Sequence, residues 1–321
     1  MDNKKWFKEA KFGMMAHFGL YSILGGEWKG QRMTDIGEWV QAYFRITKNE
    51  YAKLADVFNP IYFDAEEWIK LARDAGMKYF VITAKHHDGF ALYKSDVDKF
   101  NSVDATPFGR DIIAECAEAC KKYGLKLGLY YSQEIDWRHP DGGGWGNPIK
   151  NFANTVPWDN QWDFPDISKK NYTRCFEEKI KPQVKEILTK FDDLALIWFD
   201  TPYNISPEQS KELYDMVKLY QPDCLVNSRI GNGMGDYESA EDNVVPEQAP
   251  GKLFESPCTL NNTWGWKSFD NDWKSAEQIV KTKKHLNDNN MNYLLNVGSD
   301  YLGRIPAPAY DILRKVGQMC R

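Results

Sequence analysis

The 321-residue sequence has no apolar run close to the ~20 residues that a membrane-spanning helix requires. Its first residues, MDNKKWFKEAKFG, lack the apolar centre of a secretory signal. Basic residues form no tract, and 41 of them against 46 acidic residues give a net charge of −5, which disfavours binding to nucleic acid. We therefore expect no membrane or nucleic-acid partner. A cytoplasmic location is the simplest prediction, with a secreted form that has lost its signal as the alternative.

Paired cysteines are also missing. None of the six cysteines belongs to a CxxC motif, and Cys116 and Cys120 lie four residues apart in a predicted helix. This spacing is typical of buried thiols in a reducing compartment. No GxGxxG motif follows an early strand, which argues against a dinucleotide-binding fold.

Aromatic residues, in contrast, are abundant. The chain contains 12 Trp, 17 Tyr and 17 Phe residues, 14% of the total. Many of these rings will belong to the core, because aromatic side chains carry much of the apolar surface that folding buries. Exposed tryptophan faces can also stack on the apolar C–H faces of sugars.

Strand and helix patterns alternate along the whole chain. Apolar strands without polar alternation, each followed by a helix, indicate a parallel sheet covered on both faces. Seven or eight such units with no break in composition favour a closed (β/α)8 barrel, similar to the TIM barrel, as a single domain over residues 1–321. The expected strands are 12–18, 78–90, 125–132, 194–200, 224–229, 252–260 and 291–298. The expected helices are 64–76, 109–124, 168–190, 206–221, 275–288 and 308–319, with irregular segments at 133–166 and 231–251.

Polar residues recur where the predicted strands end. In a parallel barrel the active site lies at the carboxyl ends of the strands, so these residues are expected to share one mouth. The set consists of His17, His86, His87, Tyr131, Asp200, Arg229 and Asn296. A single histidine here would more often be structural, but several on neighbouring strand ends favour a functional site.

Asp200 ends the apolar run LALIWFD. It could cap the following helix, but Ser206 is closer to that helix and suits the N-cap better. A carboxylate at a barrel mouth beside Trp198 suits a nucleophile that attacks the anomeric carbon of a sugar. That mechanism needs a second carboxyl group about 5–5.5 Å away. The candidates downstream are Glu238, Glu241, Asp242, Glu247 and Glu255.

Several motifs together resemble the α-L-fucosidases of glycoside hydrolase family 29. The matching stretches are KFGMMAHFGLYS, GEWV, TAKHHDGFALYKS, GLYYS, LIWFD, VNSRIG, DYESAE, TWGW and NYLLNVGSDYLGRIP. They occur in the family's order over nearly the whole chain.

The resemblance implies a retaining exo-α-L-fucosidase that removes terminal α-L-fucose from a fucosylated oligosaccharide or glycoconjugate through a covalent intermediate on Asp200. It implies a substrate pocket of His17, Glu38, His86, His87, Tyr131, Trp198, Arg229 and Trp264. The resemblance does not assign the general acid/base to a single residue, because its position varies in the family. Glu241 in DYESAE is the first choice and Glu255 the second, and the adjacent Asp242 could serve instead. For Glu238 and Glu247 a solvated loop position is preferred.

The sequence departs from the family at two places. The family usually has Asn-Asp-Arg-Trp where this chain has Asn227, Ser228, Arg229 and Ile230, so contacts around the conserved arginine are expected to differ. Most relatives also carry a β-sandwich after the barrel, for which no segment is expected here. Specificity beyond fucose and the oligomeric state are therefore not predicted.

Two other functions compete with this prediction. His17, His86, His87 and Asp88 could form a zinc site, since histidine and carboxylate clusters bind zinc. Adjacent residues on one strand point to opposite faces, however, so His86 and His87 are not expected to share a metal. We expect neither a metal nor a cofactor. The second alternative is a fucose-binding protein without turnover, which the available carboxyl groups disfavour.

Overall fold

The computed structural model describes residues 3–147 and 156–321. Eight parallel strands form one sheet in the order β7-β6-β5-β4-β1-β10-β9-β8. They are β1 (Phe12–His17), β4 (Tyr79–Lys85), β5 (Lys126–Tyr131), β6 (Leu196–Phe199), β7 (Leu225–Val226), β8 (Glu238–Ser239), β9 (Phe254–Thr259) and β10 (Asn292–Gly298).

The two outer strands of this order, β7 and β8, meet just beyond β7. A parallel bridge joins Asn227 to Tyr237, and the Ser228 amide donates a hydrogen bond of 2.9 Å to the Tyr237 carbonyl. This contact brings the ends of the sheet together, and the predicted (β/α)8 barrel is confirmed.

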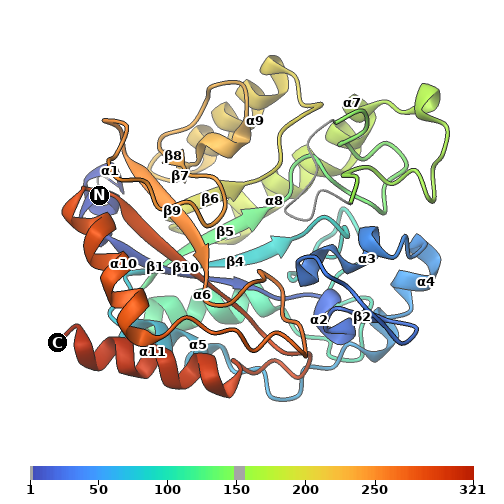
Figure 1. Cartoon of the computed structure of the whole chain (residues 1–321). Coiled ribbons are helices and arrows are strands. Elements are labelled where there is room, and N and C mark those ends of the chain that lie inside the picture. The colour runs from blue at the N-terminus through green and yellow to red at the C-terminus, as the bar shows by residue number, and fades with distance from the viewer. Residues whose placement is uncertain (1–2, 148–155) are drawn as a thin grey trace.

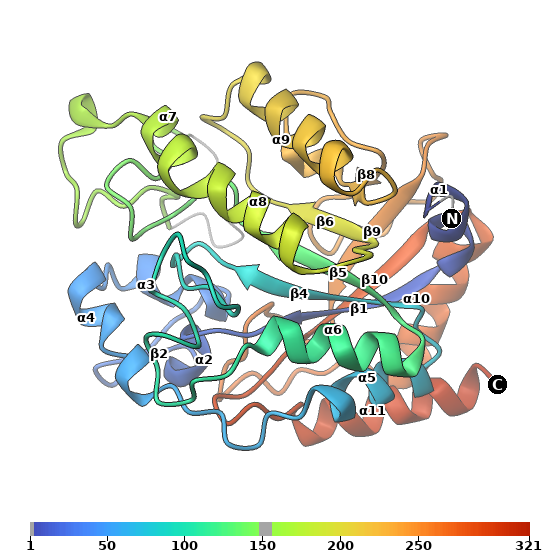
Figure 2. The same ribbon diagram turned by 180° about the vertical axis from the view of Figure 1, so that it is seen from behind.

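Helices cover the outside of the barrel (Figures 1 and 2). α5 packs against α6 and α11, α8 against α9, and α10 against α11. The large helices are α5 (Ala65–Asp74), α6 (Ile112–Tyr123), α8 (Lys181–Lys190), α9 (Pro207–Tyr220), α10 (Ala276–Asp288) and α11 (Ala307–Met319). The shorter elements are α1 (Asn3–Ala10), α2 (Tyr21–Leu24), α3 (Val40–Tyr43), α4 (Lys48–Ala52), α7 (Tyr172–Cys175) and a hairpin of β2 (Glu27–Trp28) and β3 (Gln31–Arg32). α2, α3 and α4 lie at the end of the barrel opposite both termini (Figure 1).

Local sequence explains where the helices begin. Ser206 caps α9 by accepting a hydrogen bond from the Gln209 amide, while the Gln209 side chain accepts one from the Ser206 amide. Ser275 and Gln278 form the same capping box on α10. Because Ser206 fills the cap of α9, Asp200 is left for another role.

Several elements differ from those expected. The helix expected at 168–190 starts at Tyr172 and consists of α7, a π-helical segment (Phe176–Ile180) and α8. The strand predicted at 78–90 ends at Lys85, and the one predicted at 224–229 contains only Leu225 and Val226. β8 is a two-residue strand inside the segment expected to be irregular. Its two residues pair with the start of β9, a tertiary contact that a two-residue pattern cannot reveal.

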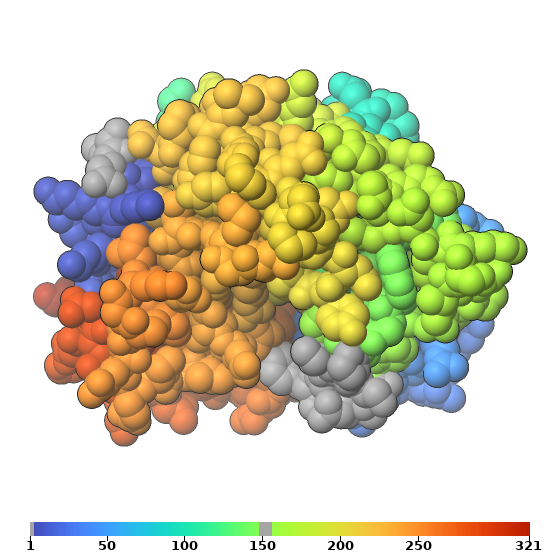
Figure 3. Space-filling model, turned by 90° about the horizontal axis from the view of Figure 1, so that it is seen from above, coloured from blue at the N-terminus to red at the C-terminus, as the bar shows by residue number. Residues whose placement is uncertain are grey.

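The strands pack their side chains into one large core, and every residue of β1, β4 and β10 is buried. Cys116 and Cys120 are buried free thiols, as predicted. Within the described residues, no helix has the length and apolar character to cross a membrane. From above, α9 and the segments around β8 and β9 form much of the surface (Figure 3).

Candidate active site

A cavity of about 580 Å³ lies at the carboxyl ends of the strands, within the ~300–1,000 Å³ range of ligand pockets. Nine of the eleven residues predicted for the site line it. They are His17, Glu38, His86, His87, Trp198, Asp200, Arg229, Glu241 and Trp264. The two that do not are Tyr131 and Glu255.

Asp200 follows β6 and is 9% exposed. Its Oδ1 accepts a hydrogen bond of 3.0 Å from Arg229, and its Oδ2 accepts one of 2.8 Å from the Tyr130 hydroxyl. The Asp200 amide donates to Gln133 Oε1 at 2.7 Å. These three contacts fix the orientation of the carboxylate toward the cavity, as a nucleophile requires.

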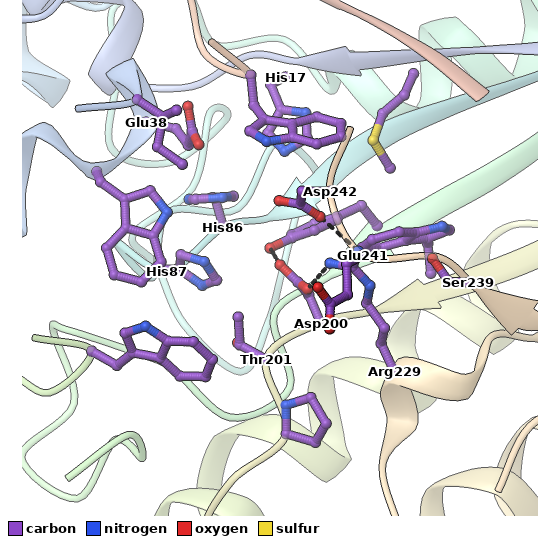
Figure 4. A pocket seen from close by; sticks show the side chains of 18 of the residues that line it. His17, Glu38, His86, His87, Asp200, Thr201, Arg229, Ser239, Glu241 and Asp242 are labelled. Atoms are coloured by element: carbon purple, nitrogen blue, oxygen red, sulfur yellow. Dashed lines mark hydrogen bonds and ion pairs between the residues drawn. The ribbon is translucent and has the colours of Figure 1, made fainter. Parts of the chain in front are cut away.

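Arg229 connects two carboxylates (Figure 4). One guanidinium nitrogen contacts Asp200, and the other donates to Asp242 at 2.6 Å and to the Ala240 carbonyl at 2.7 Å. The guanidinium also lies over the Trp198 ring, 4.6 Å from its centroid. The charges of Asp242 and Asp200 raise the pKa of Arg229 despite burial, which lowers it. The arginine therefore stays charged and holds both carboxylates at one side of the cavity.

Hydrogen bonds set the tautomers of two histidines. His17 Nδ1 lies 2.7 Å from Asn296 Oδ1, and the Asn296 amide group donates to the Trp264 carbonyl. An amide oxygen only accepts, so His17 carries its proton on Nδ1. His87 Nδ1 lies 2.7 Å from the Ser132 hydroxyl, which itself donates to the Ile135 carbonyl. His87 is therefore protonated on Nδ1 as well, and Nε2 of both rings is left as an acceptor.

Burial keeps these histidines neutral. It lowers the pKa of His17 to about 4 and the pKa values of His86 and His87 well below the usual 6.5. The rings of His86 and His87 lie 4.0 Å apart, and both line the cavity. They do so because β4 ends at Lys85, so the strand alternation that would separate them no longer applies.

Glu38 supplies a hydrogen-bond donor to the cavity, in addition to the accepting histidines. It is 2% exposed, and its Oε2 accepts a hydrogen bond of 2.6 Å from the Gly265 amide. Burial raises the pKa of Glu38 to about 8. At neutral pH the group is a carboxylic acid that can donate a hydrogen bond to a hydroxyl oxygen, whereas the neutral histidines can accept one from a hydroxyl.

Tyr131 is a correction to the predicted pocket. Its hydroxyl donates to Gln183 Oε1 on α8 at 2.8 Å, away from the cavity, while the preceding Tyr130 lines the cavity. Tyr130 pairs in register with Trp198, and Tyr131 pairs with Phe199. Since side chains alternate along a strand, the residue beside Trp198 is the one that faces inward.

Glu255, the second choice for the general acid, is also placed elsewhere. It is fully buried inside the barrel, where it accepts hydrogen bonds from the Tyr79 hydroxyl at 2.6 Å and from Trp198 Nε1 at 2.9 Å. It lies at the start of β9, whereas the cavity lies at the carboxyl ends of the strands. Trp198 thus stands between Glu255 and the cavity.

The segment after β8 supplies two carboxyl groups to the cavity, Glu241 and Asp242. Glu241 is exposed, and Asp242 is half-buried against Arg229. Of the other acidic candidates, Glu238 pairs with Lys252 and Glu247 is exposed, and neither lines the cavity.

Several lining residues were not predicted: Met15, Ile36, Trp39, Tyr130, Trp158, Thr201, Pro202, Ser239 and Ala240. Tyr130 is identified only by the pairing of β5 with β6, which places it beside Trp198. Trp158 belongs to the long segment expected to be irregular, where no periodic pattern gave a signal. Thr201 is adjacent to Asp200, but only the loop conformation decides where its side chain lies.

The residues weighed for a zinc site do not converge. The Asp88 carboxylate accepts hydrogen bonds from the Tyr51 hydroxyl at 2.9 Å and the Phe90 amide at 3.1 Å. It is absent from the cavity lining that contains the three histidines. Across residues 3–147 and 156–321, no three His, Cys, Asp or Glu side chains are grouped as a metal would require.

Known proteins with this fold carry the same sequence pattern. The family model of α-L-fucosidase matches residues 1–321. A putative α-L-fucosidase of Caenorhabditis elegans is 30% identical over 99% of the chain, and the tissue α-L-fucosidase of Rattus norvegicus is 29% identical over 98%. The chain spans 66% and 67% of the length of these two relatives.

Two solved structures are similar over the full length. The α-L-fucosidase AlfC from Lactobacillus casei in complex with α-L-fucose is 50% identical, with a TM-score of 0.95 over 99% of this chain and 98% of that one. The AlfC variant D200A in complex with Fucα(1,6)GlcNAc gives the same values. With the family model matched from end to end, the chain belongs to the α-L-fucosidase family.

Proposed function

We propose that the protein is a retaining exo-α-L-fucosidase, a glycoside hydrolase in which Asp200 is the nucleophile. The observation that carries this proposal is the pair of carboxylates, Asp200 and Asp242, held by one guanidinium in a cavity lined by neutral histidines. Retaining glycosidases need two carboxyl groups close together on either side of the scissile bond. The contacts of both carboxylates with one guanidinium support this assignment.

The reaction proceeds in two steps. The Asp200 carboxylate attacks the anomeric carbon of fucose, the bond to the glycosidic oxygen breaks, and the general acid gives that oxygen a proton. The same group, now a base, removes a proton from water, which attacks the anomeric carbon and releases Asp200. Two inversions leave the configuration retained.

We assign the acid/base to Asp242 and keep Glu241, the first choice from sequence, as the alternative. Asp242 contacts the same guanidinium as Asp200, so its position relative to the nucleophile is fixed. Glu241 is exposed. Fixed catalytic groups lose less freedom when the transition state forms. Arg229 binds only Oδ1 of Asp242, which leaves Oδ2 to carry the proton.

The same cavity suits fucose. Nε2 of His17 and His87 accepts hydrogen bonds from ring hydroxyls, and the neutral Glu38 carboxyl donates one. Trp264 lines the cavity and offers an apolar face for the methyl group of a deoxy sugar. Trp198 lines it too, but its ring already contacts the Arg229 guanidinium and the stacked Tyr130 ring. For the natural substrate we propose a fucosylated glycan, with fucose linked α(1,6) to N-acetylglucosamine tested first, because the similar AlfC structure holds that disaccharide.

The nucleophile is tested with 4-nitrophenyl α-L-fucoside. The wild-type protein should hydrolyse it with retention, and Asp200→Ala should lower kcat by roughly 10⁴-fold while circular dichroism stays unchanged. A fluorinated fucoside that traps the intermediate should add the mass of one fluorofucosyl group to the peptide that contains Asp200. Near wild-type turnover in the variant would refute the assignment.

The acid is tested with Asp242→Asn and Glu241→Gln on fucosides of good and poor leaving groups. Loss of the true acid should slow the poor leaving group by about 10²–10⁴-fold and the good one far less. Azide should restore the activity of that variant toward the good leaving group by acting as a nucleophile that needs no base. If Glu241→Gln alone shows this pattern, the assignment moves to Glu241. If neither does, the retaining mechanism on this pair is wrong.

A further inference from the structure

Thr201, the residue that follows the nucleophile, has an unusual backbone. Its φ is 55°, in the left-handed region, which β-branched residues adopt rarely because of steric strain. Thr201 also lines the cavity. Strain at a residue adjacent to a catalytic group is maintained only where the surrounding structure imposes it.

Two buried side chains from the segment after β5 impose this conformation. Gln133 accepts the Asp200 amide at 2.7 Å, as described above. The Glu134 carboxylate accepts hydrogen bonds from the amides of the three residues after Pro202, those of Tyr203 at 2.5 Å, Asn204 at 2.6 Å and Ile205 at 3.0 Å. Both side chains are 0% exposed. The turn that carries Thr201 is therefore fixed at both ends.

The Thr201 hydroxyl has no hydrogen-bond partner within the described parts of the chain, although its oxygen is buried. The same is true of the indole N–H of Trp158, another lining residue. Buried polar groups almost always find partners, so each exception requires an explanation. A ligand that brings its own hydroxyl groups would supply both partners.

Thr201 lies apart from His17 and Glu38, two of the groups suited to fucose (Figure 4). It is beside Asp200, on the side away from His17 and Glu38 (Figure 4). Trp158 comes from the segment between β5 and α7, and Trp39, at 6.3 Å between ring centroids, is its nearest described aromatic neighbour in the cavity lining. A hydroxyl and an indole that line one cavity suit a second sugar ring, which needs both a stacking face and hydrogen bonds.

We infer that the Thr201 hydroxyl, with the Trp158 N–H, binds hydroxyl groups of the sugar to which the fucose is attached. Thr201 is thus a specificity-determining residue for the leaving group. This inference rests on the proposed fucosidase function. It explains why a strained threonine follows the nucleophile: the strain turns a polar group toward the departing sugar.

The test compares two substrates of one enzyme. 4-Nitrophenyl α-L-fucoside has a leaving group without hydroxyls, and Fucα(1,6)GlcNAc has a sugar. Thr201→Val keeps the β-branched shape and removes the hydroxyl. It should lower the ratio of kcat/KM for the disaccharide to kcat/KM for the nitrophenyl substrate about three- to tenfold, the range of one hydrogen bond. Thr201→Ser should restore the ratio.

Thr189→Val is the matched control, because Thr189 lies on the exposed side of α8 and bonds to its own helix. It should leave both rates unchanged. Equal losses on both substrates in Thr201→Val would place the hydroxyl against fucose and overturn the inference, and so would an unchanged ratio. If Thr201→Val does not fold, Trp158→Phe decides: its ratio should fall in the same way, and an unchanged ratio overturns the inference. Wild-type protein that hydrolyses neither substrate would instead refute the proposed function.

Discussion

The carboxyl group of Glu38 is unusual among the acidic residues of the cavity because burial makes it neutral at physiological pH. Its pKa, raised to about 8, means that it loses the proton within an accessible range. Below that pH the carboxyl group can donate a hydrogen bond to a group in the cavity, and above it the carboxylate cannot. The donor is lost on the alkaline side.

Glu38→Gln should therefore remove an alkaline limb. In the wild type, kcat/KM should fall as the pH passes through about 8, because this parameter reports ionisations of the free enzyme. The glutamine keeps an N–H donor at every pH, so its profile should be flat there, with a lower maximum. An identical alkaline limb in both proteins would show that another group causes it.

Glu255 differs from Glu38 in its position, because it lies inside the barrel and not in the cavity. It accepts the Trp198 N–H, and Trp198 in turn supports Arg229 and hence Asp200. This makes it a positioning residue. Glu255→Gln keeps an acceptor for Trp198, whereas Glu255→Leu leaves the indole N–H buried without a partner, at a cost of about 1–3 kcal/mol.

Glu255→Leu should therefore lower thermal stability and slow good and poor leaving groups by the same factor, and Glu255→Gln should remain close to wild type. Leaving-group assays and thermal unfolding measure both effects. A loss confined to poor leaving groups in Glu255→Gln would instead identify Glu255 as the general acid.

At the scale of single elements, the residues that follow the strands could be predicted from the sequence. Which side chains of a strand point into the barrel could be predicted less well. Asp200 and Arg229 follow apolar runs, and the barrel directs such residues to one mouth. The choice between Tyr130 and Tyr131 depended on pairing with β6, which the sequence does not state. Glu255 could have been recognised from its place at the start of a strand, the wrong end for a barrel site.

The packing of α11 on α5 depends on one glycine. A Cβ added at Gly317 would lie 2.0 Å from the Asp74 carbonyl oxygen, so the two helices would have to separate. Gly317→Ala should destabilise the protein by about 1–3 kcal/mol through overpacking, even though alanine favours helix formation.

Urea unfolding measures this effect, with Lys315→Ala on the exposed side of the same helix as the control. The control should stay within about 0.5 kcal/mol of wild type. Equal stability of Gly317→Ala and wild type would show that the contact between α5 and α11 relaxes without loss.

For the molecule as a whole, the alternating pattern was enough to predict the barrel, because each long strand and helix is strongly apolar on its buried side. Of the two closing strands, β7 lies within the strand expected at 224–229, whereas β8 was not predicted. β7 and β8 have two residues each, and their pairing depends on neighbours distant in sequence. The same holds for Trp158 and Thr201, whose positions follow from loop conformation rather than from periodicity.

Buried ionisable groups should shape the pH dependence of stability. Burial raises the folded-state pKa of Glu38 to about 8 and of Glu255 to about 7, from 4.5. Between these values the folded protein binds more protons than the unfolded chain, so stability falls as pH rises. The pKa of His17 is lowered from 6.5 to about 4. Between these pH values the unfolded chain binds more protons at His17, so this residue makes stability rise with pH up to about pH 6.5. From pH 6.5 to 8 the effect of His17 has ended, and the decline due to the two carboxyl groups continues.

Urea unfolding at pH 6.5 and 8 should show this decline in the wild type and a smaller one in the double variant Glu38→Gln, Glu255→Gln. The comparison needs the same salt concentration at both pH values, because surface ion pairs respond to screening. A decline of equal size in both proteins would assign the pH dependence to other groups.

The joint between β7 and β8 has a consequence for motion. The Asn227–Tyr237 bridge closes the barrel, and further hydrogen bonds join Val226 and Ser228 to residues 236–239. The strands at this joint have two residues each, whereas β1 pairs with β10 over six residues. Local unfolding begins where few contacts hold the chain, so we expect the amides of the joint to exchange with solvent before those of β1. Each opening would also break the ion pair of Arg229 with Asp242, so the closure of the barrel and the placement of two residues of the cavity depend on the same short joint.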